Sequence, residues 1–332
     1  MAPTIKDIAQ ALGITHSTVS RALNGREGVS PKLRQSILET AEELGYTPNA
    51  IARGLVNRQS KTIAFIVPDF ANPFFVEIAR AVNSKASARG FKTIMCDTQW
   101  SHQEELKQIK MMSENRVDGI IIKSFGEDDS YLVNLGLPVV KLNPTADPGL
   151  SSIDIDNHAG ALAATEHLIQ CGYEQIAYIG SLLDPQTLQG RIDGYRQALR
   201  ACGRLYDPRL VALGEYSLES GSRCYQDLLA TGIPFDAVVC ENDMIALGVY
   251  TCALHDQREI PAQFGLIGFD DIFIAGLPMT QLTTIAQPKF QIGERAANLL
   301  IDLIVDPIQT KNQSILLHPE LVVRSTTRKS VK

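Results

Sequence analysis

The sequence lacks the features of exported, membrane-embedded and disulfide-bonded proteins. Its first ten residues, MAPTIKDIAQ, contain no charged segment followed by an apolar run, so they predict no secretion signal. No later stretch approaches the roughly 18 consecutive apolar residues of a membrane span. The six cysteines form no CxxC pair, which favours free thiols over disulfides or a metal site. These absences predict a cytoplasmic protein.

The common motifs of α/β enzymes are also absent. The chain contains no GxSxG nucleophile elbow, no GxxxxGKS/T phosphate loop, no HExxH zinc motif and no GxGxxG dinucleotide loop. Its six histidines show no metal-ligand spacing. The acid pair Asp128 and Asp129, or Asp270 and Asp271, resembles a glycosidase couple, but neighbouring carboxylates in loops are usually solvated. An enzyme is therefore not expected, and neither a cofactor nor a metal is predicted.

The composition is that of a globular protein with more than one core. The chain has 332 residues, of which 45% are hydrophobic and 20% are charged. Its net charge of -6 is unevenly distributed, because residues 1–58 carry seven basic and five acidic side chains, a balance of +2 that leaves -8 for the remainder. A basic surface for an anionic partner is therefore expected at the N-terminal end.

Three short helix patterns fill the first 45 residues. Residues 4–13 begin with a threonine and an aspartate spaced as in a capping box, and they end in glycine. Thr15 predicts the N-cap of a second helix at about 16–23. A third pattern covers about 30–45 and again ends in glycine. Three short helices with a tight glycine turn between the first two predict a helix-turn-helix unit.

The second helix pattern, THSTVSRAL, divides its polarity unevenly. Its first turn is polar, and Val19, Ala22 and Leu23 alone give it an apolar face. In a helix-turn-helix unit the second helix lies in the major groove with its first turn at the base edges, which requires such a division. An ordinary capped surface helix suits the same residues equally well, so this pattern alone leaves both alternatives open.

The following segment supports the DNA-binding alternative. Residues 46–62, YTPNAIARGLVNRQSKT, predict a proline-initiated helix of one to two turns and a polar linker. So short a helix is unstable alone and must be ordered by a partner. The segments IKDIAQALGITHSTVSRALNG and VSPKLRQSILETAEELGYTPNAIARGL resemble the DNA-binding domain and hinge of the LacI/GalR family of bacterial transcriptional regulators. The resemblance extends along nearly the whole chain.

The resemblance implies roles for individual residues of this region. The base readers would be His16, Ser17 and Arg21. The residues near phosphates would be Thr4, Thr15, Thr18, Ser20, Asn24 and Ser30. In the hinge, Leu55 matches the leucine that wedges into the minor groove, with Asn49, Ala52 and Arg53 lying along it.

From Lys61 onward, apolar runs alternate with helical patterns, which predicts an α/β core with parallel sheets. The predicted strands are TIAFIVPD, FKTIMCD, DGIIIKS, LPVVKLN, QIAYIGS, DAVVCEND and FGLIGFDD. They form two sets, which indicates two similar lobes with a crevice between them.

The resemblance implies a periplasmic-binding-protein-like core in which the chain crosses back. The implied domains are a helix-turn-helix DNA-binding domain at 1–46, a hinge helix and linker at 47–60, and an effector-binding and dimerisation core at 61–332. Within the core, lobe one would comprise about 61–157 and 288–316, and lobe two about 158–287 and 317–332.

Parallel α/β sheets bind ligands beyond the carboxyl ends of their strands. After the first strand come Asn72, Phe74 and Phe75, and aromatic faces beside an amide suit a sugar or base ring, although Phe75 also suits a core. By resemblance, Thr187 and Arg191 contact effector; Arg191 offers a fork of donors, but an arginine early in a helix is more often solvated. The remaining residues expected around the crevice are Ser124, Asp156, Tyr216, Asn242, Asp243, Asp270 and Gln287.

Two positions depart from sugar-binding relatives. Asn143 stands where many of them have aspartate, and Lys123 lies near the end of the preceding strand. Losing an acid and gaining a nearby base favours an anionic effector, such as a sugar acid or sugar phosphate. The alternative is that Lys123 points away from the crevice.

Together these features predict a sequence-specific DNA-binding regulator that acts as a homodimer on double-stranded operator DNA. By resemblance it is a repressor of a carbohydrate catabolic operon, controlled by a sugar or sugar derivative in the crevice. A nucleoside- or purine-responsive regulator of the same family is the alternative, and dimers that pair into tetramers stay open. A transport solute-binding protein is disfavoured because it would need a secretion signal and no helix-turn-helix.

Overall fold

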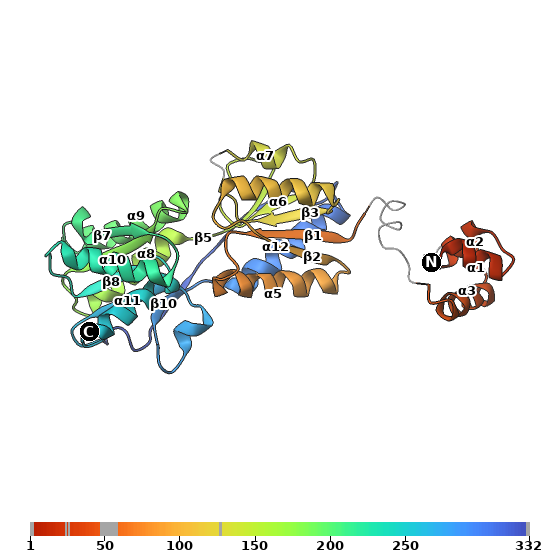
Figure 1. Ribbon diagram of the computed structural model, residues 1–332. Coiled ribbons are helices and arrows are strands. Elements are labelled where there is room, and N and C mark those ends of the chain that lie inside the picture. Colours follow the sequence, from red (N-terminus) through yellow and green to blue (C-terminus); the bar gives the residue numbers. More distant parts are fainter. Residues whose placement is uncertain (1–2, 24, 26, 47–58, 126–127, 330–332) are drawn as a thin grey trace. The chain divides into compact units, whose positions relative to one another are not determined.

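The computed structural model describes residues 3–23, 25, 27–46, 59–125 and 128–329. The chain divides into two compact units, residues 1–60 and 61–332 (Figure 1). Asn24 and the four hinge residues implied by the resemblance lie outside the described residues; the four are Asn49, Ala52, Arg53 and Leu55.

The first unit contains the three predicted helices. They are α1 (Ile5–Ala11), α2 (His16–Leu23) and α3 (Pro31–Glu43). Their apolar faces form one small core from Ile8, Ala9, Val19, Ala22, Ile37 and Ala41. Gly13 has a φ of 64°, a left-handed conformation that favours glycine and that ends the first helix before the tight turn. The predicted helix-turn-helix unit is confirmed.

The second unit is built on two six-stranded sheets. Lobe one has the strand order β11 (Ser314–Leu317), β5 (Ser151–Ile155), β4 (Val139–Lys141), β3 (Gly119–Ile122), β1 (Thr62–Val67) and β2 (Lys92–Asp97). Lobe two has the order β12 (Glu320–Val322), β10 (Thr283–Ala286), β9 (Gly265–Asp270), β8 (Ala237–Cys240), β6 (Ile176–Ser181) and β7 (Val211–Gly214). All neighbouring strands are parallel except β10 and β12, which are antiparallel. The predicted α/β class is confirmed.

Helices cover both faces of each sheet, as parallel sheets require. In lobe one, α5 (Pro73–Ala88) and α12 (Lys289–Val305) share a core on one face, and α6 (His102–Glu114) and α7 (Ser130–Val133) cover the other. In lobe two, α8 (Asn157–Gln170) and α9 (Pro185–Ala201) lie opposite α10 (Leu218–Ala230) and α11 (Asp243–His255). Short 3-10 turns complete this lobe at η1 (Pro208–Leu210) and η2 (Phe273–Gly276).

The chain passes between the lobes three times, after β5, after β10 and after β11. The seven strands predicted from apolar runs are present. The strands β5, β7, β10, β11 and β12 are not among the predicted segments. Two of them, β5 and β10, have the sequences SSIDI and TTIA, which carry few consecutive apolar residues. Within the described part of the chain, no helix is long and apolar enough to cross a membrane.

Helices α10 and α11 approach each other at backbone contact because each contributes a glycine. A methyl group on Gly248 would lie 2.1 Å from the carbonyl oxygen of Leu218, and one on Gly221 would lie 2.2 Å from that of Ile245. Both distances are far below van der Waals contact. The close approach lets both helices pack on the same lobe-two core.

We expect Gly248→Ala to lower the free energy of unfolding by about 1 to 3 kcal/mol, the usual cost of overpacking. Urea unfolding of both proteins measures this difference. Gly276→Ala is the matched control, since its new methyl group would meet no atom closer than 3.7 Å. Equal stability of the two variants would show that α10 and α11 separate without cost.

Candidate functional site

The second helix of the first unit presents a polar face to solvent. Val19 and Ala22 are buried against the other two helices. His16, Ser17 and Arg21 are exposed on α2. Helix α2 therefore has the apolar inner face and the polar outer face that the sequence predicted. The three residues expected to read bases lie on the outer face.

The hydroxyl groups at the start of α2 bond to one another. Thr15 Oγ1 lies 2.8 Å from Ser17 Oγ and 2.9 Å from Thr18 Oγ1, and it accepts the Thr18 backbone N–H at 3.3 Å. Thr15 is thus the N-cap of the helix, as predicted. A cap of this kind fixes the first turn, from which His16 and Ser17 project.

Two other residues expected near phosphates also cap helices. Thr4 donates its hydroxyl and its backbone N–H to the Asp7 carboxylate, at 2.8 and 2.7 Å. Ser30 Oγ accepts the Leu33 backbone N–H at 3.3 Å. Ser20 is half-buried on α2. Helix starts are favourable places for anions, because their backbone N–H groups point outward.

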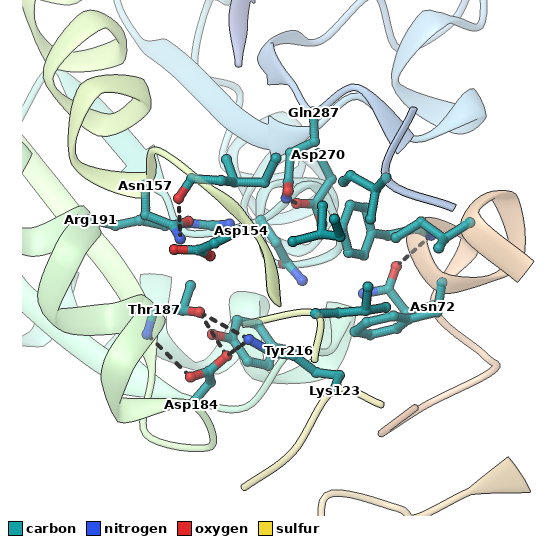
Figure 2. Close-up of a pocket in the computed structure, with 18 of the residues that line it drawn as sticks. Asn72, Lys123, Asp154, Asn157, Asp184, Thr187, Arg191, Tyr216, Asp270 and Gln287 are labelled. Carbon is teal, nitrogen blue, oxygen red and sulfur yellow. Dashed lines mark hydrogen bonds and ion pairs between the residues drawn. The ribbon is translucent and has the colours of Figure 1, made fainter. Parts of the chain in front are cut away.

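A cavity in the second unit lies at the carboxyl ends of strands from both lobes (Figure 2). It encloses about 650 Å³ of space free of protein atoms, part of it open to solvent. Ten of the residues expected around the crevice line it: Asn72, Phe74, Phe75, Lys123, Thr187, Arg191, Tyr216, Asn242, Asp270 and Gln287. Phe75 belongs both to the core and to the crevice, the two positions considered from the sequence. Its ring is buried in the lobe-one core and also lines the cavity.

Four further polar or aromatic residues of the lining were not expected: Trp100, Asp154, Asn157 and Asp184. Trp100 follows β2 and Asp184 follows β6, so the strand-end rule that found the others applied to both. Asp154 lies within β5, a strand that the sequence did not reveal. Asn157 begins α8 directly after it.

The structure does not bring Asp156 or Asp243 to this cavity. Asp156 is the N-cap of α8 and accepts the Ala159 backbone N–H at 2.9 Å. Asp243 is fully buried and accepts the Thr284 hydroxyl at 2.6 Å. Asp156 therefore caps a helix, and Asp243 bonds to β10 in the interior. The prediction that both line the cavity is wrong.

Ser124 and Asn143 line a neighbouring hollow instead of the cavity. The Asn143 side-chain oxygen accepts the backbone N–H and the hydroxyl of Ser124, each at 3.3 Å. The Asn143 amide also lies 3.5 Å from the Gln186 side chain of lobe two. These contacts join the Asn143 side chain to Ser124 of lobe one and to Gln186 of lobe two.

Lys123 and Asp184 form an ion pair between the lobes inside the cavity. Their Nζ and Oδ2 atoms lie 2.7 Å apart, and both side chains are largely buried. Asp184 also caps α9 by accepting the Thr187 backbone N–H and hydroxyl. Burial by itself would raise the pKa of Asp184, but the Lys123 charge and these hydrogen bonds outweigh it and lower the pKa to about 2. Lys123 points into the crevice, yet its charge is already neutralised.

Arg191 is held from three sides at the lobe-two wall. Its Nε donates to the Asn157 side-chain oxygen at 2.8 Å, and Nη1 donates to the Glu241 backbone oxygen. The guanidinium lies over the Phe269 ring, 3.5 Å from its centroid. The side chain is 6% exposed. The alternative of a solvated Arg191 is therefore wrong, and its contact with an effector stays a prediction.

Glu241 lies behind the cavity wall, 1% exposed. Its carboxylate accepts the Tyr216 hydroxyl and the Ser181 backbone N–H, each at 2.5 Å. Burial raises its pKa to about 7, although the Arg191 charge and both hydrogen bonds act in the opposite direction. Near neutral pH this group is therefore partly protonated.

Asp270 ends β9 with an unusual backbone conformation, a φ of 109°. Its carboxylate accepts the Gln287 amide at 2.6 Å, and its backbone oxygen accepts the Lys289 ammonium at 2.8 Å. Burial raises the pKa of Asp270 to about 6 against the lowering effect of Arg191. Gln287 and Lys289, which follow β10 where the chain crosses to lobe one, thus hold Asp270 in place at the cavity.

Aromatic side chains connect the two lobes. Trp100 and Phe74, both from lobe one, pack against the cores of lobe one and lobe two. The Trp100 ring lies 4.8 Å from the Tyr216 ring of lobe two and 5.3 Å from that of Phe125, measured between centroids. The cavity therefore has an apolar wall that touches both lobes and a polar wall that carries charge.

A helix-turn-helix unit joined to a two-lobed α/β core with a polar cavity defines the class of ligand-controlled DNA-binding proteins. Comparison with known proteins gives the family. Residues 4–49 match the model of bacterial regulatory proteins of the lacI family. Residues 60–322 match that of periplasmic binding proteins and the sugar-binding domain of the LacI family. The chain belongs to the LacI family of bacterial transcriptional regulators.

Curated relatives match over nearly their whole length. The regulator RegA of Clostridium saccharobutylicum is 33% identical over 98% of this chain and 100% of its own. The repressor CytR of Escherichia coli K12 is 33% identical over 98% and 97%. These relatives are transcription regulators and not enzymes.

Solved structures show the same architecture. A complex of the regulator CelR with cellobiose has a TM-score of 0.74 and 31% identity, and the match covers 98% of this chain and 99% of that one. The Lac repressor dimer bound to operator and an anti-inducer has a TM-score of 0.86 and 25% identity, with 99% and 100% covered.

The raised pKa of Glu241 predicts a pH-dependent stability. Between pH 4.5, its usual pKa, and about 7 the folded state keeps a proton that the unfolded state has lost, so the free energy of unfolding falls as pH rises. Asp270 acts in the same direction below about pH 6.

We expect Glu241→Gln to flatten the pH dependence across this range, because the amide cannot ionise. Urea unfolding of parent and variant at several pH values between 4.5 and 7 measures the two slopes. Parallel curves would show that Glu241 keeps an ordinary pKa in the folded state.

Proposed function

We propose that this regulator is a homodimeric repressor of carbohydrate-use genes and that an uncharged, hydroxyl-rich effector binds in the cavity between its lobes. The observation that carries this proposal is the charge balance of the cavity. Among the described residues that line the cavity, the three carboxylates Asp154, Asp184 and Asp270 outnumber the two cations Lys123 and Arg191. A site with surplus acid attracts hydroxyl donors and repels anions.

The charge balance disfavours the sugar acid or sugar phosphate considered from the sequence. That expectation depended on Lys123, whose ammonium is paired with Asp184. The relatives support a neutral sugar, since solved structures of this architecture carry cellobiose in one case and ribose in another. A nucleoside remains the second candidate, because the aromatic wall of Phe74, Trp100 and Tyr216 also suits a base.

DNA recognition follows from the exposed face of α2. We assign residues 1–46 to DNA binding, 47–60 to the hinge and 61–332 to effector binding and dimerisation. The base edges in each half of a near-palindromic operator would be read by His16, Ser17 and Arg21. The operator is expected to be near-palindromic because a symmetric dimer binds two equivalent half-sites. A relative of this architecture, the Lac repressor, binds its operator as a dimer.

The effector would act through the arrangement of the lobes. Lys123 pairs with Asp184, and Trp100 packs on Tyr216, so a ligand in the cavity must change contacts that join lobe one to lobe two. A ligand that prefers one lobe arrangement changes DNA affinity by the same free energy by which DNA changes the affinity for ligand.

Arg21→Ala tests the DNA-binding face. We expect operator affinity to fall by about 1 to 3 kcal/mol and the sequence preference to relax at one position per half-site. The operator is first selected from random DNA by the parent protein. The control is Lys32→Ala, which removes an exposed positive charge from α3. An equal loss on operator and random DNA for Arg21→Ala would make Arg21 a phosphate contact.

Arg191→Lys tests the effector site while keeping the charge. A lysine cannot bond Asn157 and the Glu241 backbone together, so we expect effector affinity to fall by tenfold or more. Operator affinity without effector should stay unchanged. Calorimetry with the sugar that the parent binds measures the first quantity. Arg196→Lys, on the outer face of the same helix, is the control. Unaltered effector affinity in Arg191→Lys would remove Arg191 from the site.

A further inference from the structure

Asp154 occupies a distinctive position in the cavity wall. It lies in β5, between Ile153 and Ile155, which are buried in the lobe-one core. Its own side chain is half-buried and lines the cavity. Figure 2 shows the carboxylate between Arg191 on one side and the group formed by Lys123 and Thr187 on the other.

The other two carboxylates of the lining already have side-chain partners. Asp184 accepts from Lys123 and Thr187, and Asp270 accepts from Gln287. For Asp154, by contrast, no side chain in the described ranges donates a hydrogen bond or forms an ion pair.

The two nearby cations are engaged elsewhere. Lys123 is paired with Asp184 at 2.7 Å, and Arg191 is bonded to Asn157 and to the Glu241 backbone. They lower the pKa of Asp154 only from a distance, and burial, the larger effect, raises it. The Ile155 backbone N–H donates to the Asp154 carboxylate, which otherwise has no side-chain partner in the described ranges. A half-buried carboxylate with so few donors costs stability. A ligand that donates to it recovers that cost.

We propose that Asp154 is the specificity-determining residue of the cavity and accepts hydrogen bonds from two adjacent hydroxyl groups of an uncharged ligand. This inference rests on the proposed function and deepens it by naming the group that the effector must present. A carboxylate has two acceptor oxygens and no donor, so it matches a pair of neighbouring hydroxyls and excludes a carboxylate or phosphate at the same place.

The test uses pairs of ligands that differ in one feature. Binding is measured by calorimetry and thermal shift with D-ribose and 2-deoxy-D-ribose, D-glucose and D-gluconate, cellobiose, and D-glucosamine. We expect the parent to bind at least one uncharged sugar and to prefer it over its deoxy or anionic counterpart by tenfold or more.

Asp154→Asn removes the charge and one acceptor while keeping the shape. We expect the affinity for the uncharged sugar to fall by tenfold or more and the preference over the deoxy or anionic counterpart to narrow. The melting temperature without ligand should stay equal or rise, because the variant no longer buries a carboxylate that lacks a side-chain partner. Asp156→Asn is the matched control, since Asp156 caps α8 outside the cavity and asparagine caps a helix equally well.

Three outcomes would overturn the inference. Equal sugar affinity in Asp154→Asn and the parent would remove Asp154 from recognition, with the proposed function intact. Tighter binding of D-gluconate or D-glucosamine than of every uncharged sugar would show that the site selects charge. Failure of every compound to bind the parent would contradict the carbohydrate effector itself, and this inference with it.

Discussion

The ion pair between Lys123 and Asp184 is the interaction on which the effector site depends. It joins the end of β3 in lobe one to the start of α9 in lobe two, and both side chains are largely buried. A buried ion pair costs desolvation, so removing either partner leaves an uncompensated charge. The pair therefore contributes to the charge of the cavity and fixes a contact between the lobes.

The remaining charges of the cavity follow from this pairing. Lys123 is neutralised by Asp184, and the guanidinium of Arg191 bonds to Asn157 and to the backbone of Glu241. The Lys289 ammonium bonds to the backbone oxygen of Asp270 and not to its carboxylate. Acid is in excess, and burial raises the pKa values of Asp154, Asp270 and Glu241. Hydroxyl groups, which donate without adding negative charge, complement such a site.

Much of the fold and part of the site could be predicted from local pattern. The capped helices and apolar strands have periodicities of their own, and the strand-end rule placed Asn72, Lys123 and Asp270 at the wall where the structure has them. The rule failed for Asp156 and Asp243 because a carboxylate at a helix start has two uses, capping or ligand contact, and neighbouring elements choose between them. It missed Asp154 because β5 alternates polar and apolar residues.

The helix-turn-helix unit and the α/β class could be predicted from the sequence, because both depend on short-range spacing of capping, apolar and turn residues. The family followed from the resemblance of the N-terminal segments. Tertiary structure alone decided which charges meet. Lys123 and Asp184 are 61 positions apart in the sequence, and no local pattern reports that they pair at 2.7 Å. That contact is the reason why we propose an uncharged effector in place of the anion expected from the sequence, because an electrostatic site depends on distances across the fold and not only on which charged residues are present.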